Sequence, residues 1–308
     1  MSGADAPSPF LAQTVRAQDG CRLFVRDYRP VAPPPGDRPP GDRPVVLCLG
    51  GVARTSADFH DLAQRLAAQG WRVVAPDYRG RGRSARSAPR RYRPEVYLED
   101  LRHIRVALGL GPAVVIGSSL GGLLGCALGV AAPGALKGLV MNDIGPDVSL
   151  GGLGRVVDYI KAAPSYADWD DAAAAMRDLM PDLNPGPGET AGEDDWRRVA
   201  EATFRREADG RLHPMWDPAI AESMGTDAAI PDLWPLFRSA RRAPALAIRG
   251  GKSDILSAET LQRMQAAHPL LSALTLPHKG HTPTLDEPES LAAIEALLAR
   301  VAGASDTR

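Results

Sequence analysis

Short apolar runs that alternate with helical segments are the feature of this sequence that most limits its fold. The runs begin near residue 44 and are continuous, which is typical of strands that helices cover on both faces. They read, in chain order, VVLCLG, WRVVAP, AVVIGS, LKGLVMND, ALAIRG and LSALTLP. Two of the intervening helical segments end at Gly70 and at Pro133-Gly134, which are helix-termination signals. This alternation predicts an α/β fold with a mostly parallel central sheet and helices on both faces.

Two other regions complete the predicted organisation. The segment QTVRAQDGCRLFVRDYRP reads as two strands joined by a tight turn at Asp19-Gly20. Residues 145–238 interrupt the strand–helix alternation with helical pieces and no convincing strand. We therefore predict a core of residues 1–144 and 239–308 and a helical cap, or lid, at 145–238. Insertions at the carboxyl edge of such a sheet often cover a ligand site.

Composition narrows the classes of partner. The 36 basic and 37 acidic side chains nearly cancel, so bulk charge gives no reason to expect a nucleic acid or a membrane. We expect a small-molecule acyl substrate and water as partners, while the oligomeric state is not determined. The N-terminus lacks the basic start and apolar run of a secretion signal, and Leu120 to Ala132 is too short an apolar stretch to span a bilayer. A cytoplasmic location is the expectation.

Motifs for cofactors and metals fail on inspection. GRGRSA fits the dinucleotide-binding pattern G-x-G-x-x-A, but the segment that follows it, RSAPRRYRP, cannot open a helix at once. GGKS resembles the end of a phosphate-binding loop but lacks the first glycine of that motif. The sequence contains no H-E-x-x-H or paired-cysteine motif, so we expect no cofactor and no catalytic metal. The arginines between Arg79 and Arg93 form a basic run that reads as a solvated loop, with contact to an anionic substrate as the alternative.

The strongest chemical signal is GSSLG, which matches G-x-S-x-G only with Ser119 at its centre. A nucleophile on a sharp strand-to-helix turn needs small residues two positions away on each side, because backbones crowd there. Ser118 would have Ile116 and Leu120 at those places. The apolar strand before the motif and the glycine-rich helix after it are the expected context, so we predict Ser119 as the nucleophile.

A serine nucleophile needs a base, and the chain has six histidines. Four of them lie inside helical segments, at a helix end or in the insertion, where structural roles are the simpler interpretation. His278 and His281 follow the last strand directly. Gly280 lets the loop turn back toward the sheet edge, so we predict His281 as the general base and keep His278 as the second candidate.

The histidine needs a carboxylate to orient it, and the expected chain order is serine, acid, histidine. Asp254 lies just past one strand in this interval, and Asp143 ends an earlier strand in the same interval. We favour Asp254 and keep Asp143 as the alternative acid. Asp77 precedes the serine and reads as a structural loop residue.

The tetrahedral oxyanion of acyl transfer needs preorganised N–H donors. We assign one to the backbone N–H of Leu120 at the start of the helix. The second is assigned to Val52, because Gly50-Gly51 after the strand VVLCL permits a close backbone approach.

Taken together, these motifs resemble the α/β-hydrolase superfamily, from about Gln13 through the last helix. DYRGRGRS looks like the family segment after the second parallel strand, GSSLGG like its nucleophile elbow, GGKSDILS like its acid loop and KGHTPTLDEP like its histidine loop. In that family the oxyanion strand typically ends in His-Gly, and here Gly50 replaces the histidine. NDIGP before the insertion is similar to a bacterial subgroup with a helical cap, mostly of undefined substrate.

The resemblance and the serine site together lead us to expect a hydrolase of a small carboxylic ester or lactone that works through an acyl-enzyme. Carbon–carbon bond hydrolases and acyltransferases of this family use the same residues. A non-catalytic ligand-binding module of the same fold is the alternative from a different class.

Overall fold

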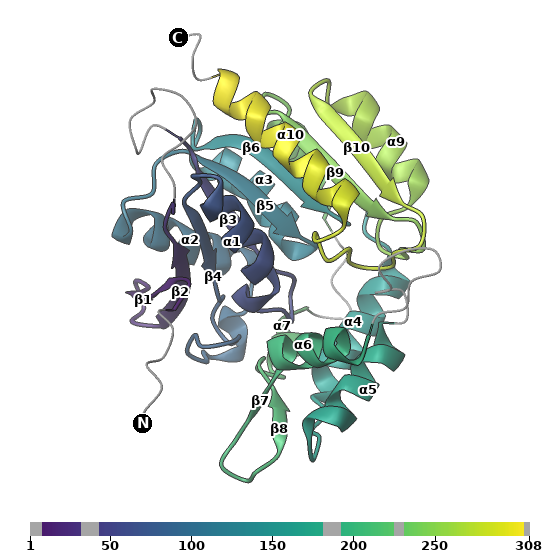
Figure 1. Ribbon diagram of the computed structural model, residues 1–308. Coiled ribbons are helices and arrows are strands. Elements are labelled where there is room, and N and C mark those ends of the chain that lie inside the picture. The colour runs from purple at the N-terminus through teal and green to yellow at the C-terminus, as the bar shows by residue number, and fades with distance from the viewer. Residues whose placement is uncertain (1–7, 32–42, 181–191, 225–230, 305–308) are drawn as a thin grey trace.

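The computed structural model describes residues 8–31, 43–180, 192–224 and 231–304, and it contains an eight-stranded sheet in the order β1-β2-β4-β3-β5-β6-β9-β10 (Figure 1). The strands of this sheet are β1 (Leu11–Arg16), β2 (Arg22–Tyr28), β3 (Val45–Leu49), β4 (Val73–Pro76), β5 (Ala113–Ser118), β6 (Leu136–Asn142), β9 (Ala245–Gly250) and β10 (Leu271–Leu276). β1 pairs antiparallel with β2, and β2 pairs antiparallel with β4. The remaining neighbours from β4 to β10 pair in parallel.

The mostly parallel sheet predicted from the apolar runs is confirmed. Every residue of β3 and of β4 is buried, which explains why these runs lack polar alternation. The predicted turn between the first two strands is also present. Gly20 lies there with φ +81°, a backbone conformation that glycine adopts without steric cost.

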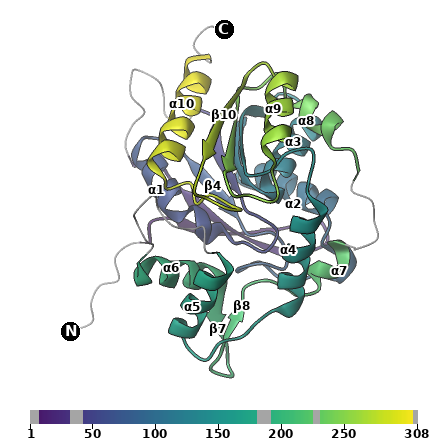
Figure 2. The same ribbon diagram turned by 90° about the vertical axis from the view of Figure 1, so that its right-hand side faces the viewer.

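Helices cover both faces of the sheet (Figures 1 and 2). On one face, α1 (His60–Ala68) and α10 (Pro288–Ala304) pack against the central strands and bury an apolar cluster between themselves and the sheet. The other face is covered by α2 (Pro94–Ala107), α3 (Leu120–Ala131), α8 (Trp234–Ser239) and α9 (Ala258–Ala267). Short 3-10 helices at Ser56–Phe59 and Pro89–Arg91 complete the loops of this core.

The segment between β6 and β9 lies beside one end of the sheet (Figure 1). Before α8, this segment contains α4 (Leu150–Ala162), α5 (Trp169–Leu179), α6 (Glu193–Thr203), β7 (Phe204–Arg206), β8 (Leu212–Pro214) and α7 (Ile220–Met224). The expectation of no strand in this segment is wrong, because β7 and β8 form an antiparallel hairpin. Each strand has three residues, too few for an alternating pattern to show in the sequence.

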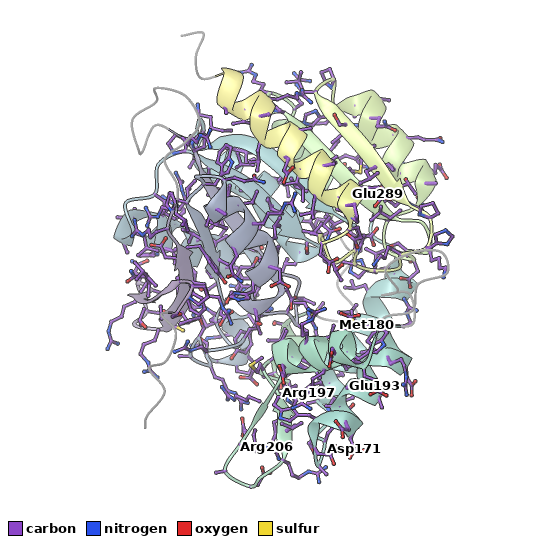
Figure 3. All side chains as sticks on the ribbon, viewed as in Figure 1. Asp171, Met180, Glu193, Arg197, Arg206 and Glu289 are labelled. Atoms are coloured by element: carbon purple, nitrogen blue, oxygen red, sulfur yellow. The ribbon has the colours of Figure 1, made fainter. Side chains whose placement is uncertain are left out.

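The cap has a small apolar core of its own and a charged exterior. Met176 of α5, Trp196 of α6 and Leu212 of β8 are among the buried residues that form this core. Elsewhere α5, α6 and β7 carry charged groups, among them the labelled residues Asp171, Glu193 and Arg206, which are exposed (Figure 3). The cap is therefore an amphipathic layer whose outer surface is solvated.

A buried ion-pair network ties the first strands to α2. Arg79 is 1% exposed and donates to both carboxylate oxygens of Asp100, at 2.7 and 2.6 Å. It also donates to Asp19 at 2.6 Å, and this hydrogen bond lowers the pKa of the Asp19 carboxyl to about 2. Arg79 and Arg81 are thus buried, so the reading of the basic run as a uniformly solvated loop is wrong for these two side chains.

Replacing Asp100 with alanine is expected to lower the free energy of unfolding by about 3 kcal/mol, because it removes one partner of a buried charge. Urea unfolding followed by circular dichroism measures this change. The matched control is Glu201→Ala, which breaks an exposed i,i+4 pair with Arg197 and is expected to cost less than about 1 kcal/mol. Equal losses in the two variants would contradict this account of the network.

His268 introduces a pH-dependent term into the stability of the core. His268 is 1% exposed and its ring lies beside that of Phe237, at 5.7 Å between ring centroids. Burial lowers the pKa of His268 below its ordinary 6.5. The unfolded chain therefore binds a proton more readily than the folded protein, so the stability from the neutral ring is present above pH 6.5 and is lost as pH falls below it.

We expect His268→Leu to flatten the decrease in melting temperature between about pH 6.5 and pH 5 relative to wild type. Thermal unfolding across this pH range measures the slope. His103→Gln on α2 is the control, and its slope is expected to match that of wild type. An unchanged slope in His268→Leu would show that another group titrates in this range.

Candidate active site

The predicted nucleophile lies at a cramped bend between a strand and a helix. Ser119 separates β5 from α3 and has φ +50° and ψ −118°, a backbone conformation uncommon for a residue with a side chain. A Cβ atom on Gly117 would collide with the backbone of Gly121 and Gly122, and one on Gly121 would collide with the carbonyl of Leu49. The structure thus gives both glycines of G-x-S-x-G the steric role inferred from the sequence.

The neighbouring serine lies in a different environment. The Ser118 hydroxyl accepts a hydrogen bond from Asn142 Nδ2 at 3.0 Å and belongs to the last position of β5. The Ser119 hydroxyl makes no hydrogen bond with the described residues. This difference favours Ser119 as the reactive serine.

His281 contacts Asp143, the alternative acid, and not Asp254. The two atoms His281 Nδ1 and Asp143 Oδ2 are 2.7 Å apart, and the Asp143 side chain is fully buried. Asp143 follows β6 directly and has φ +54°. Its carboxylate also accepts hydrogen bonds from the Gly250 N–H at 2.8 Å and from the Ser253 hydroxyl. These donors hold the carboxylate in an orientation that aims it at the imidazole.

The predicted pairing of His281 with Asp254 is therefore corrected. The Asp254 carboxylate forms an ion pair with Arg155 of α4 and is 40% exposed. β6 and β9 are adjacent parallel strands, so the residues after both strands reach the same edge of the sheet. The order of serine, acid and histidine along the chain allows either aspartate, and only the direction of each loop decides between them.

Asn142 joins the serine bend to the histidine loop, a role that the sequence analysis missed. Its carbonyl accepts a hydrogen bond from the Ser119 N–H at 2.9 Å. Its Nδ2 donates to the carbonyl of Pro283 at 2.8 Å, two residues after His281, as well as to Ser118. The only sequence signal was its position immediately before Asp143.

His281 retains a free nitrogen on the side away from Asp143. Within the described parts of the chain, no hydrogen bond engages His281 Nε2, and none joins it to the Ser119 hydroxyl. The side chain is 16% exposed. His278, the second candidate for the base, is exposed on the loop after β10 and does not contact Asp143.

The glycine loop after β3 lies against the serine. A Cβ atom on Gly51 would lie 3.7 Å from Ser119 Cβ, which is van der Waals contact, so the loop lies directly beside the serine. Val52 follows, and its N–H has no partner within the described residues. Leu120 is the first residue of α3, where a helix leaves its N–H groups unbonded. Both predicted oxyanion donors thus belong to the segments that flank Ser119.

Asp77 links loops next to the serine bend, in agreement with its interpretation as a structural residue. Its carboxylate accepts hydrogen bonds from the N–H of Ser56 at 2.7 Å and from the N–H of Arg83 at 2.8 Å. Burial raises the pKa of Asp77, and these hydrogen bonds oppose that effect. The carboxylate connects the 3-10 helix after the glycine loop to the loop after β4.

The described residues offer neither a metal-binding cluster nor a helix that could cross a bilayer. They contain no group of three or more His, Cys, Asp or Glu side chains that is arranged to hold a metal ion. None of their helices is long and apolar enough to cross a bilayer.

Comparison with known proteins places this arrangement in a family. Residues 44–187 match the family described as the alpha/beta hydrolase fold. A crystal structure of an alpha/beta hydrolase from Novosphingobium aromaticivorans is 39% identical, with a TM-score of 0.86 over 96% of this chain and 100% of that chain. The 3-hydroxybutyrate-oligomer hydrolase of Cupriavidus necator is 29% identical over 262 residues, which are 80% of this chain and 86% of that protein.

A second relative is named for a different substrate. The 2-(acetamidomethylene)succinate hydrolase of Mesorhizobium japonicum is 24% identical over 239 residues, which are 77% of this chain and 81% of that protein. The sheet order, the strained serine bend and the full-length match to the Novosphingobium structure lead to one assignment. This chain belongs to the α/β-hydrolase superfamily.

Proposed function

We propose that this protein is a serine hydrolase that cleaves a small carboxylic ester through an acyl-enzyme, with Ser119, His281 and Asp143 as its triad. The observation that carries the proposal is the 2.7 Å contact between His281 Nδ1 and the buried Asp143 carboxylate, beside a serine held in a left-handed bend. Asp143 fixes the ring so that the proton of the neutral imidazole is on Nδ1 and the lone pair is on Nε2. The opposite nitrogen is then the base.

The proposed reaction has two stages. Ser119 Oγ attacks the ester carbonyl while His281 Nε2 takes the hydroxyl proton, and Asp143 stabilises the resulting imidazolium. The N–H groups of Val52 and Leu120 bind the oxyanion of the tetrahedral intermediate. Collapse of that intermediate breaks the ester C–O bond, and the alcohol leaves with the proton from His281. Water, deprotonated by His281, then hydrolyses the acyl-enzyme to release the acid and restore Ser119.

An ester substrate is the choice that one relative supports. The Cupriavidus necator protein is named as a hydrolase of 3-hydroxybutyrate oligomers, in which hydroxy acids are joined by ester bonds. We propose the same bond type for this chain and a lactone as the cyclic form of the same chemistry. The part of residues 145–238 that precedes α8 is proposed to roof the pocket as a cap and to select the acyl group.

The nucleophile is tested by Ser119→Ala with Ser118→Ala as the matched control. Ser119→Ala is expected to lose fluorophosphonate labelling and to lower kcat for p-nitrophenyl butyrate by more than about 10³-fold, because alanine has no hydroxyl to attack the carbonyl. Ser118→Ala loses only a hydrogen bond with Asn142 and is expected to keep most activity. If both variants label like wild type, Ser119 is not the nucleophile.

The acid is tested by comparing Asp143→Asn with Asp254→Asn. We expect Asp143→Asn to lower kcat by about 10³- to 10⁴-fold, because an amide no longer stabilises the imidazolium or sets its tautomer. Asp254→Asn weakens an exposed ion pair with Arg155 and is expected to stay within about threefold of wild type. The reverse ranking would restore Asp254 as the acid.

Turnover also separates catalysis from pure binding. Wild-type protein is expected to hydrolyse at least one member of a p-nitrophenyl ester series from acetate to octanoate, with release of nitrophenolate followed by absorbance. Tight binding of these esters without turnover would identify a ligand-binding module instead.

A further inference from the structure

Arg81 is a buried arginine whose charge has no carboxylate partner among the described residues. It lies in the DYRGRGRS segment after β4 and is 1% exposed. Its guanidinium lies over the rings of Tyr97 and Tyr78, at 4.7 and 5.4 Å from their centroids. Burying an unpaired cation is costly, so its compensation has to come from other groups.

Backbone carbonyls provide part of that compensation, since they accept from two of the three guanidinium nitrogens. Arg81 Nη1 donates to the carbonyl of Arg79 at 2.9 Å, and Arg81 Nε donates to the carbonyl of Val52. The second contact spans 29 residues and ends on the glycine loop beside Ser119. Arg79, two positions earlier, has two carboxylate partners. The two buried arginines therefore bind different groups, carboxylates in the case of Arg79 and backbone carbonyls in the case of Arg81.

Three consecutive carbonyls of the glycine loop accept hydrogen bonds from other parts of the protein or from the loop itself. The Gly50 carbonyl accepts from the Tyr78 hydroxyl at 3.3 Å, and the Gly51 carbonyl accepts from the Arg54 N–H at 3.2 Å. The Val52 carbonyl accepts from Arg81. In a trans peptide the C=O and the following N–H point in opposite directions. Holding the Gly51 carbonyl therefore fixes the direction of the Val52 N–H, and the bond from Arg81 to the Val52 carbonyl fixes the next peptide, so that Val52 is held on both sides.

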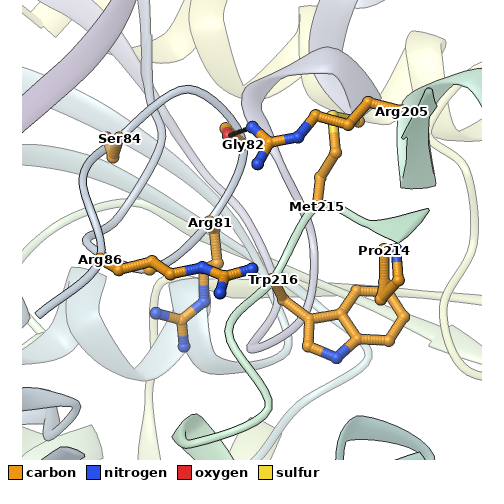
Figure 4. Close-up of a pocket in the computed structure, with 9 residues that line it drawn as sticks. Arg81, Gly82, Ser84, Arg86, Arg205, Pro214, Met215 and Trp216 are labelled. Carbon is orange, nitrogen blue, oxygen red and sulfur yellow. Dashed lines mark hydrogen bonds between the residues drawn. The ribbon is translucent and has the colours of Figure 1, made fainter. Parts of the chain in front are cut away.

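The backbone that carries Arg81 is itself anchored to the cap (Figure 4). The Gly82 N–H donates to the carbonyl of Met215 at 2.6 Å, and the Asp217 N–H donates to the carbonyl of Gly80 at 2.8 Å. Arg81 thus lies opposite Trp216 in a short antiparallel bridge. Arg205 of β7 adds a hydrogen bond to the Gly82 carbonyl at 3.3 Å. The Arg81 side chain extends from this bridge to the glycine loop.

We propose that Arg81 is a positioning residue that holds the glycine loop in the orientation that aims the Val52 N–H at the oxyanion. This inference rests on the proposed serine hydrolase function and adds a residue that does not touch the substrate. Its effect belongs to the transition state, because the oxyanion exists only there.

The test compares Arg81→Met with Arg83→Met. Methionine keeps the packing on Tyr97 but cannot donate to Val52. We expect Arg81→Met to lower kcat for p-nitrophenyl butyrate by about tenfold or more, with KM for this ester within about threefold of wild type. Inhibition by a trifluoromethyl ketone, which forms a tetrahedral oxyanion, is expected to weaken by a factor similar to that in kcat. Arg81→Lys, which keeps a donor, is expected to fall between Arg81→Met and wild type.

Arg83 is a suitable control because it is exposed two positions later and lies over the ring of Phe24 at 4.0 Å. Arg83→Met is expected to match wild type in all three measurements. The proposal is overturned if Arg81→Met weakens the binding of substrate and of inhibitor by the same factor, or if it weakens the binding of neither.

Tyr78→Phe keeps the proposal testable if Arg81→Met does not fold. It removes only the hydroxyl that binds the Gly50 carbonyl, and we expect a kcat decrease of about threefold to tenfold with KM unchanged. Hydrogen–deuterium exchange gives a readout that does not need activity. Peptides covering residues 50–54 are expected to exchange at least about threefold faster in Arg81→Met than in Arg83→Met. Equal exchange overturns the proposal, whereas absent turnover in wild type counts against the serine hydrolase assignment alone.

Discussion

The close packing of α3 on the sheet is the constraint on which the rest of the site depends. Gly121 lies against the carbonyl of Leu49 in β3, and Gly125 lies against Val115 in β5. The helix therefore begins directly at the carboxyl edge of the sheet, and the chain has to turn within one residue, Ser119. A left-handed conformation at a residue with a side chain costs about 1–3 kcal/mol and persists only where the surroundings over-determine it.

That bend sets the place where the other groups have to meet. The end of β6 lies next to the end of β5, so Asn142 binds the Ser119 N–H while Asp143 faces the histidine loop. The loop after β9 has a supporting role, since Gly250 and Ser253 donate to the Asp143 carboxylate. The segment that resembles the family's acid loop thus supplies hydrogen-bond donors to the Asp143 carboxylate, which the neighbouring strand carries.

Buried charge has two different uses in the segment after β4. Arg79 joins Asp19 and Asp100 in an ion-pair network that links the first strands to α2. Arg81 is bound instead to carbonyls, one of which belongs to the glycine loop. A run of arginines in the sequence looks uniform, but its members differ because successive side chains of a turning loop point in different directions.

The sequence by itself determined the features that depend on local geometry. The continuous apolar runs identified the buried parallel strands, Asp19-Gly20 identified the hairpin turn, and the glycines around Ser119 identified the bend, since each pattern follows from the conformation of a few adjacent residues. Only the tertiary structure decided that His281 contacts Asp143, that Asp254 turns toward the cap and that Arg81 reaches the glycine loop. These contacts join residues between 29 and 138 positions apart. They depend on which strands lie side by side and on which way each loop leaves the sheet, and neither is encoded in a local pattern.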